Sequence, residues 1–406
     1  MKFIKRAFFA FLWLAATLGA DEPLAIYLTW TDDPTSTMVV QWMTPKGTTT
    51  TQLGYHEQGQ SVWISAKGEA GTVEDCDVHR IHLEGLKEDR EYVFKLEGDK
   101  RQYRFKTMPK KLTRPVRMAI GGDAYYGTGF EVFHRMNRTL SFNHPDFVVI
   151  GGDIAYTNGT KHFLKGPKWA LARWQTFLRE LQKTLSREGR LIPILPVIGN
   201  HDVHKPKHRT EKPELFYEIF TFPEKGKAYR SLDFGDYLSL VMLDTGHTWQ
   251  VEGEQTAWLA KTLQSKSATY VFAAYHIAAY PSHSEFTGKK EERIRKNWVP
   301  LFEKYHVPFA FEHHNHTYKR THPLKEGKIN PGGVTYLGDG SWGVPTRKPK
   351  SPEERWYLAK SESINSCFIV TLTQDKCLVE AKNNQNQTID QVESGSKASL
   401  TPALSE

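Results

Sequence analysis

Five apolar segments in the second part of this sequence each run into residues that are able to bind a metal ion. They are Val116–Ile120 before Gly121-Gly122-Asp123, Phe147–Ile150 before Gly151-Gly152-Asp153, Ile194–Ile198 before Gly199-Asn200-His201-Asp202, Tyr270–Tyr275 before His276, and Pro308–Phe311 before Glu312-His313-His314-Asn315-His316. Tyr156 follows the second of the two Gly-Gly-Asp motifs. Strands in an open α/β sheet form a ligand crevice outside their carboxyl ends. We therefore expect these polar residues to converge at one edge.

Each of these motifs has an ordinary structural interpretation when it is taken alone. A Gly-Gly-Asp after a strand is commonly a turn, and a histidine at a strand end is commonly a hydrogen-bonded core residue. Together, the carboxylates, amide, imidazoles and phenol favour a metal site formed by Asp123, Asp153, Tyr156, Asn200, His276, His314 and His316. This set has too many donors for one tetrahedral ion and suits two ions about 3.5–4 Å apart that share a carboxylate.

The donor types also restrict the metals. Oxygen and imidazole donors favour iron, manganese or zinc over a metal that prefers thiolates. Tyr156 contributes a phenol, whose pKa is ordinarily about 10, so phenolate binding at neutral pH requires a strong, hard Lewis acid. We therefore predict two metal ions, Fe(III) and a divalent ion that is Fe, Zn or Mn.

The elements that must position these residues differ between the two parts of the chain. Residues 24–105 contain short alternating or apolar runs at strand spacing, which predict a β-sandwich with a buried Trp42 and a corner Tyr92. This segment resembles a fibronectin type III domain. After Pro115, strands alternate with amphipathic helices, which predicts an α/β domain. The expected helices are Phe130–Asn143, Trp169–Arg187, Gln255–Leu263 and Glu291–Tyr305.

The order of the strand-end motifs resembles that of the calcineurin-like metallophosphoesterases. Most of that superfamily place a histidine two residues after the first aspartate, where this chain has Tyr125. The purple acid phosphatases lack that histidine and carry a tyrosine three residues after the second aspartate, as at Tyr156; the Thr317-Tyr318-Lys319-Arg320 segment is also similar. The resemblance implies an α+β sandwich with two central mixed sheets flanked by helices, behind the fibronectin type III-like domain.

The same resemblance implies a role for each site residue. Asp123, Tyr156 and His316 would bind the ferric ion, Asn200, His276 and His314 the divalent ion, and Asp153 would bridge them. His201 would contact a phosphoryl oxygen, with Asp202 orienting it, and His283 is the candidate acid for the leaving group. Tyr125 and His313 replace two glycines of the family pattern, which predicts a narrower pocket.

The function implied is hydrolysis of phosphate monoesters at acidic pH, by attack of a metal-bound hydroxide. A phosphodiesterase or nucleotide hydrolase of the same superfamily is an alternative, and so is an exported binding module with an inactive metallophosphoesterase fold. The expected partners are small-molecule phosphate esters. The formal net charge of +8 on 406 residues is too weak an excess to predict nucleic-acid binding, and the oligomeric state is left open.

Composition and local signals predict the limits of the domains. The composition, 25% charged and 39% hydrophobic with 3 Cys, is that of a globular protein without a disulfide framework. A basic start followed by an apolar run predicts a cleaved signal peptide over residues 1–20 and a secreted or periplasmic protein. No later stretch is apolar and long enough to span a membrane. We expect the fibronectin type III-like domain at 21–108, a linker at 109–115, the catalytic domain at 116–383 and a polar tail at 384–406.

Overall fold

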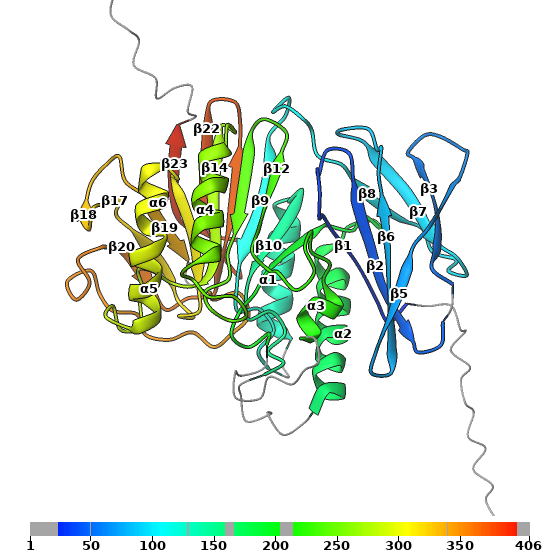
Figure 1. Cartoon of the computed structure of the whole chain (residues 1–406), viewed down its shortest axis with the longest axis horizontal. Coiled ribbons are helices and arrows are strands. Elements are labelled where there is room, and N and C mark those ends of the chain that lie inside the picture. The colour runs from blue at the N-terminus through cyan, green and yellow to red at the C-terminus, as the bar shows by residue number, and fades with distance from the viewer. Residues whose placement is uncertain are drawn as a thin grey trace, which may run out of the picture.

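The computed structural model describes residues 23–48, 50–127, 130–158, 166–203, 214–338 and 340–395. The predicted signal peptide and residues 396–406 of the predicted tail lie outside these ranges. Figure 1 shows a smaller all-β domain, coloured blue to cyan, beside a larger domain of sheets and helices. This arrangement confirms the predicted fold class.

The N-terminal domain is a sandwich of two four-stranded antiparallel sheets. One sheet has the order β1 (Ala25–Thr29), β2 (Met38–Pro45), β6 (Cys76–Leu83) and β5 (Glu69–Val73), and the other β4 (Ile64–Lys67), β3 (Gln52–Glu57), β7 (Glu91–Leu96) and β8 (Tyr103–Lys106). Trp42 is buried in the core as expected. The Tyr92 hydroxyl accepts a hydrogen bond from the Lys87 N–H at 2.8 Å, which confirms the corner tyrosine. The strand β5 has mostly exposed residues and lacks the apolar pattern on which the sandwich was predicted.

The larger domain contains two mixed sheets. The six-stranded sheet has the order β11 (Ile194–Val197), β10 (Phe147–Gly151), β9 (Val116–Gly121), β21 (Ser366–Leu372), β22 (Lys376–Asn383) and β23 (Thr388–Gly395). The seven-stranded sheet has the order β12 (Arg230–Phe234), β13 (Leu238–Met242), β14 (Tyr270–Ile277), β15 (Phe309–His313), β19 (Thr335–Gly338), β16 (Tyr318–Thr321) and β20 (Leu358–Glu362). A small hairpin of β17 (Leu324–Lys325) and β18 (Lys328–Ile329) stands apart.

The two sheets pack face to face, with helices on their outer faces. Alternate residues of a strand point to opposite faces, and in β14 Phe272 joins the core between the sheets while Val271 and Ala273 join the core under the outer helices. The outer helices are α1 (Glu131–Phe142), α2 (Gly166–Leu185), α3 (Leu215–Ile219), α4 (Glu254–Ser265), α5 (Lys289–Asn297) and α6 (Val299–Lys304). Both faces of each central strand are therefore buried, which explains their continuous apolar sequences.

Two expectations about this domain are wrong. The predicted single helix Glu291–Tyr305 is two helices that meet at Trp298, because Pro300 begins a new helix better than it continues one. The predicted polar tail from Asn384 contains β23, whose alternating partly buried residues pair with β22 along the sheet edge. In the hairpin of β21 and β22, Leu372 pairs with Cys377, and the three cysteines are free and buried.

The two domains share a continuous core. Trp30, at the end of β1, is fully buried and packs edge-on against Phe147 at 5.9 Å and Phe234 at 5.8 Å, and these two rings stack at 4.5 Å. Arg114 in the predicted linker pairs with Asp89 at 2.9 Å and with Asp146 at 3.0 Å, one from each domain. The predicted linker is thus a fixed part of the structure.

Candidate metal centre

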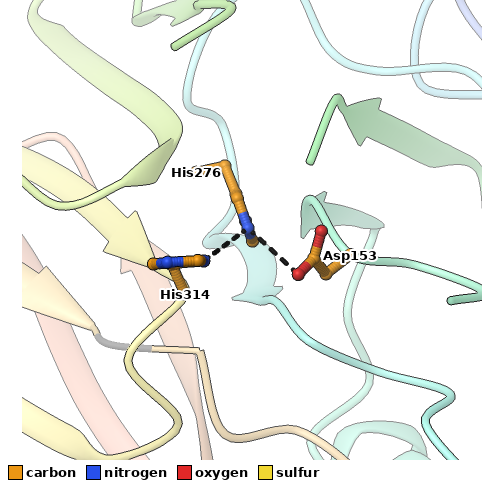
Figure 2. Close-up of side chains that lie close together, drawn as sticks. All are labelled: Asp153, His276 and His314. Atoms are coloured by element: carbon orange, nitrogen blue, oxygen red, sulfur yellow. Dashed lines mark hydrogen bonds and ion pairs between the residues drawn. The ribbon is translucent and has the colours of Figure 1, made fainter. Parts of the chain in front are cut away.

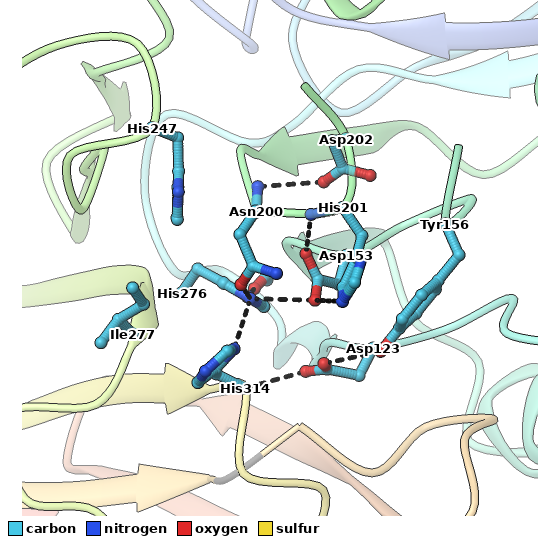
Figure 3. Close-up of polar contacts among 12 residues, drawn as sticks. Asp123, Asp153, Tyr156, Asn200, His201, Asp202, His247, His276, Ile277 and His314 are labelled. Carbon is cyan, nitrogen blue, oxygen red and sulfur yellow. Dashed lines mark hydrogen bonds and ion pairs between the residues drawn. The ribbon is translucent and has the colours of Figure 1, made fainter. Parts of the chain in front are cut away.

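The expected ligands lie in loops that leave the carboxyl ends of strands from both sheets. β9, β10 and β11 are parallel neighbours in one sheet, and β14 and β15 are parallel neighbours in the other. Figure 3 shows side chains from these loops gathered into one cluster. Every expected ligand has a side-chain donor atom within 3.3 Å of another member's: Asp123, Asp153, Tyr156, Asn200, His276, His314 and His316.

The backbone of these loops is strained where the expected ligands lie. Positive φ angles occur at Asp123 (57°), Asp153 (49°), Tyr156 (50°), His314 (82°) and His316 (59°). A non-glycine residue in this region costs about 1–3 kcal/mol and persists only where its surroundings hold it. The two aspartate loops hold each other, because the Asp123 N–H donates to the Gly152 carbonyl and the Ala124 N–H to the Asp153 carbonyl, at 2.9 and 3.1 Å. Five of the twelve non-glycine residues with a positive φ angle in the described ranges therefore lie in the cluster.

Asp123, Tyr156 and His316 form the part of the cluster that we call the phenol half. The Tyr156 hydroxyl lies 3.0 Å from Asp123 Oδ1 and 3.0 Å from His316 Nε2, and His316 Nε2 lies 3.0 Å from the same carboxylate oxygen. All three side chains are buried. Burial and the negative charge of Asp123 raise the pKa of Tyr156 well above its usual value. The phenol therefore donates to Asp123 and gives up its proton only to a strong cation.

Asn200, His276 and His314 form the imidazole half. His276 Nδ1 donates to the Gly151 carbonyl at 2.9 Å, so a neutral His276 presents the lone pair of Nε2. Within 3.3 Å of that nitrogen lie Asn200 Oδ1, His314 Nδ1 and Asp153 Oδ2, and Figure 2 shows the last two of these contacts. Acceptor atoms crowded together in a buried site repel one another unless a proton or a metal ion lies between them.

The pKa of His276 reflects the same demand for positive charge. Burial by itself lowers this pKa, but the adjacent carboxylate of Asp153 raises it, and the result is a pKa of about 9. A backbone carbonyl that fixes one imidazole nitrogen while the other faces a carboxylate is the usual arrangement around a metal-binding histidine. Asp153, His276 and His314 also form a group whose ligand atoms lie within 4.8 Å of one another.

Asp153 lies between the two halves. Its Oδ1 accepts the His201 N–H at 2.7 Å, whereas its buried Oδ2 accepts no hydrogen bond of good geometry, although His276 Nε2 is 3.3 Å away. Burial raises the pKa of Asp153, but the imidazoles of His276 and His201 outweigh it and lower the pKa below its usual value. A buried, ionised carboxylate oxygen without a donor is costly. A cation held by Asp153 and the donors of either half would remove this cost.

His201 lies against the phenol half, but Asp202 does not orient it. The His201 ring stacks on Tyr156 at 4.7 Å, with Nε2 3.8 Å from Asp153 Oδ2, and its Nδ1 is bonded to the Asn158 carbonyl. Asp202 instead accepts backbone N–H groups at 2.8 and 2.9 Å, and burial together with Asp153 raises its pKa to about 7. The prediction that Asp202 orients His201 is therefore wrong. Its side chain instead joins the loop after β10 to the loop after β11 by accepting a backbone N–H from each.

The two residues that replace family glycines both point away from the ligand cluster. The Tyr125 ring stacks on Phe130 at 5.4 Å and lies under the Arg173 guanidinium at 4.4 Å, so it fills the core beside α1 and α2. The His313 ring lies on the backbone of Gly151, where a Cβ would come within 1.9 Å of it, and neither ring nitrogen has a hydrogen-bond partner among the described residues. Tyr126 is the exposed ring beside the site, 5.0 Å from Tyr156.

His283 lies next to the ligand loop rather than in the cluster. Its Nδ1 is bonded to the Lys348 carbonyl at 2.8 Å, and its backbone N–H donates to Asn315 Oδ1 at 2.9 Å. The Ser284 N–H donates to the same oxygen at 2.6 Å. Asn315, between His314 and His316, therefore ties the loop that carries His283 to the segment that carries two expected ligands.

Several residues around the cluster escaped the sequence analysis. His247, in the loop after β13, faces His276 with ring centroids 5.6 Å apart. Glu312 and Lys319 form a fully buried ion pair on either side of the His-Asn-His segment, and Glu312 also accepts the Tyr275 hydroxyl at 2.6 Å and the Ala279 N–H at 2.7 Å. The signal was available for this pair: a glutamate that ends an apolar strand requires a buried partner.

Comparisons with known proteins agree with this geometry. Residues 116–318 match the calcineurin-like phosphoesterases, which defines the class of the larger domain. Residues 23–107 match the N-terminal domain of purple acid phosphatases. The chain belongs to the purple acid phosphatase family, as its sequence motifs indicated.

Relatives share sequence only at a modest level. Purple acid phosphatase 15 of Arabidopsis thaliana is 26% identical over 299 residues, which cover 65% of this chain and 53% of that protein. A second protein of that plant, named probable inactive purple acid phosphatase 27, is 26% identical over 277 residues, which cover 60% of this chain and 42% of that protein. The chain thus spans about half the length of these relatives.

The fold has a close counterpart among solved structures. A purple acid phosphatase from yellow lupin (Lupinus luteus) seeds superposes with a TM-score of 0.77 at 17% identity, over 92% of this chain and 74% of that one. Family membership supports phosphoester hydrolysis and implies a dinuclear metal centre. Among the helices of the described ranges, none is both long and apolar enough to cross a membrane.

Proposed function

We propose that this protein is an acid phosphatase that hydrolyses phosphate monoesters at a centre of two metal ions. The observation that carries the proposal is the buried Oδ2 of Asp153, which lies between the phenol half and the imidazole half and accepts no hydrogen bond of good geometry from the described residues. One relative is named a probable inactive purple acid phosphatase, but here every expected ligand position holds a residue with a suitable donor atom. We assign the phenol half to Fe(III) and the imidazole half to a divalent Fe, Zn or Mn ion.

Bound ions would polarise the phosphoryl group and acidify a water molecule. The residues of the chain perform the remaining tasks. Asp153 and the backbone bonds of the strained loops fix the spacing of the two halves. His201, with Nδ1 held by the Asn158 carbonyl, directs Nε2 toward the site and donates to a phosphoryl oxygen.

The overall reaction adds one water molecule across a phosphate ester. A bond forms between phosphorus and the water oxygen, the bond between phosphorus and the alcohol oxygen breaks, and one proton moves from water to the departing alcohol. His283 is our candidate for delivering that proton. Its Nδ1 hydrogen bond to Lys348 leaves Nε2 as the atom to carry it, which makes this role more important for poor leaving groups than for good ones.

A phosphodiesterase is the second candidate function, because the same metal centre serves both reactions in this superfamily. Purified protein assayed with p-nitrophenyl phosphate and with bis(p-nitrophenyl) phosphate separates the two. We expect turnover of the monoester, optimal at acidic pH, in protein that elemental analysis shows to contain about two metal ions, at least one of them iron. Turnover of the diester alone, or a single zinc ion with iron supplied, contradicts the proposal.

We further propose that the protein is secreted or periplasmic, with a cleaved signal peptide at residues 1–20, and that the catalytic domain begins near residue 116. The basic and apolar pattern of the first residues supports export. The N-terminal residue of the protein recovered from the medium or the periplasm tests this. Protein retained inside the cell with its first residues intact overturns it.

A further inference from the structure

A basic segment lies along the rim of the proposed metal centre. Residues 344–350, here the rim segment, follow β19 and carry exposed Arg347 and Lys348. The Arg347 N–H donates to the His316 carbonyl at 2.9 Å, and its guanidinium Nη1 lies 3.5 Å from the His314 carbonyl. Arg347 therefore contacts the segment that carries an expected ligand from each half of the centre.

Contacts on the far side fix the rim segment in this position. The Lys348 carbonyl accepts His283 Nδ1 at 2.8 Å, and the Lys350 N–H donates to the Ser282 carbonyl at 2.7 Å. The Val344 carbonyl accepts the Asn365 amide at 2.8 Å. Because its backbone is held at both ends, the Arg347 side chain is presented from a fixed base.

The charge of Arg347 is not neutralised by the protein. In the ranges that the structure describes, no carboxylate lies within 4.0 Å of its guanidinium, whereas the neighbouring Lys350 pairs with Glu354 at 3.2 Å and Arg355 with Glu285 at 3.4 Å.

We propose that Arg347 binds a second phosphate group of substrates whose first phosphate occupies the metal centre. This inference rests on the proposed function and names its preferred substrates, which are small phosphate monoesters that carry another phosphate a few atoms away. A guanidinium has five N–H donors in a planar fork that matches phosphate. The described contacts use one of them, in a long bond to His314.

A pair of substrates that differ by one phosphate tests this role. Fructose 1,6-bisphosphate and fructose 6-phosphate are compared with the wild type, Arg347→Ala, Arg347→Lys and the matched control Lys350→Ala, which also removes one rim cation. We expect Arg347→Ala to lower kcat/KM for the bisphosphate on the order of 10-fold, through KM, and to leave the monophosphate within about 2-fold. Arg347→Lys should recover part of the loss, because a lysine keeps the charge without the fork.

Inhibition provides a readout that does not depend on turnover of the bisphosphate. Inorganic pyrophosphate should inhibit p-nitrophenyl phosphate hydrolysis more strongly than inorganic phosphate in the wild type and lose that advantage in Arg347→Ala. Equal effects of Arg347→Ala on both fructose phosphates, or the same loss of selectivity in Lys350→Ala, overturn the inference. A wild type that hydrolyses no phosphate ester overturns the proposed function itself, which separates the two failures.

Discussion

The phenol half and the imidazole half of the centre satisfy their polar atoms in different ways. In the phenol half, the Tyr156 hydroxyl, Asp123 and His316 bond to one another at 3.0 Å. In the imidazole half, oxygen and nitrogen acceptors crowd the Nε2 of His276. The first arrangement is complete with a proton on the phenol, whereas the second requires a cation. The difference suggests a test of the proposal that the two halves bind unlike ions.

The ion that each half prefers would depend on the proton that the ion must displace. An ion in the phenol half must displace a proton from a buried tyrosine whose pKa is well above its usual value, which a trivalent ion does more readily than a divalent one. An ion in the imidazole half replaces at most the proton on His276, whose pKa is about 9. A divalent ion achieves that at neutral pH.

Removing the residue between the halves has the largest expected effect. Asp153→Ala should release both ions together and lower activity by more than the 10- to 100-fold that loss of an outer-shell partner costs. Elemental analysis of the purified variant checks this, with circular dichroism to establish that it is folded. Loss of one ion alone would mean that Asp153 does not bridge.

Removing the phenol oxygen should disable one half and spare the other. Tyr156→Phe should abolish the visible charge-transfer band of a ferric phenolate, lower activity by more than about 10²-fold and retain the divalent ion. Absorption spectroscopy and metal analysis provide the measurement. Tyr125→Phe is the matched control, because its ring lies in the core beside Phe130, and it should keep the band. The opposite result in the two variants would refute the ligand assignment.

His201 should act on chemistry without holding either ion. His201→Ala should keep two ions per chain and lower kcat on the order of 10²-fold for all phosphate esters, because it removes a donor to the phosphoryl group. Steady-state kinetics and metal analysis check this. A variant that loses metal in proportion to activity would place His201 among the ligands instead.

The smallest expected effect depends on the leaving group. His283→Ala should lower kcat for alkyl phosphates by up to about 10²-fold and leave activated aryl phosphates nearly unchanged, since only the former need a proton on departure. A plot of rate against leaving-group pKa for the wild type and the variant provides the test. Parallel plots would show that His283 holds the rim segment and delivers no proton.

Sequence patterns predicted those parts of the site that depend on strand periodicity. The apolar runs before Asp123 and Asp153 belong to parallel neighbours β9 and β10, so their ends had to meet. The direction of side chains in the loops could not be predicted, because positive φ angles at Asp123, Tyr156 and His316 turn the chain in ways that no local pattern encodes. Tyr125 therefore points into the core, although its position suggested the pocket.

Local sequence patterns also could not predict which polar residues pair when they are far apart in the sequence. Asp202 was expected to hold the adjacent His201, but its carboxylate accepts the backbone N–H groups of Ile154 and Gly199. The Asn158 carbonyl, distant in sequence, holds His201 instead. For Glu312 the sequence indicates that a buried partner is needed, but only the fold identifies Lys319 as that partner.

The aromatic contact of Trp30 with Phe147 and Phe234 has a consequence for how the protein comes apart. Phe147 is the first residue of β10, the strand whose other end leads into Asp153, so the sandwich packs against the start of a strand that positions a proposed ligand. Unfolding the sandwich alone would expose these rings to water, and interfaces that bury large aromatic rings join domains into one cooperative unit. The N-terminal domain is therefore a structural support of the proposed catalytic site. A chain shortened to the larger domain should be less stable than the full chain.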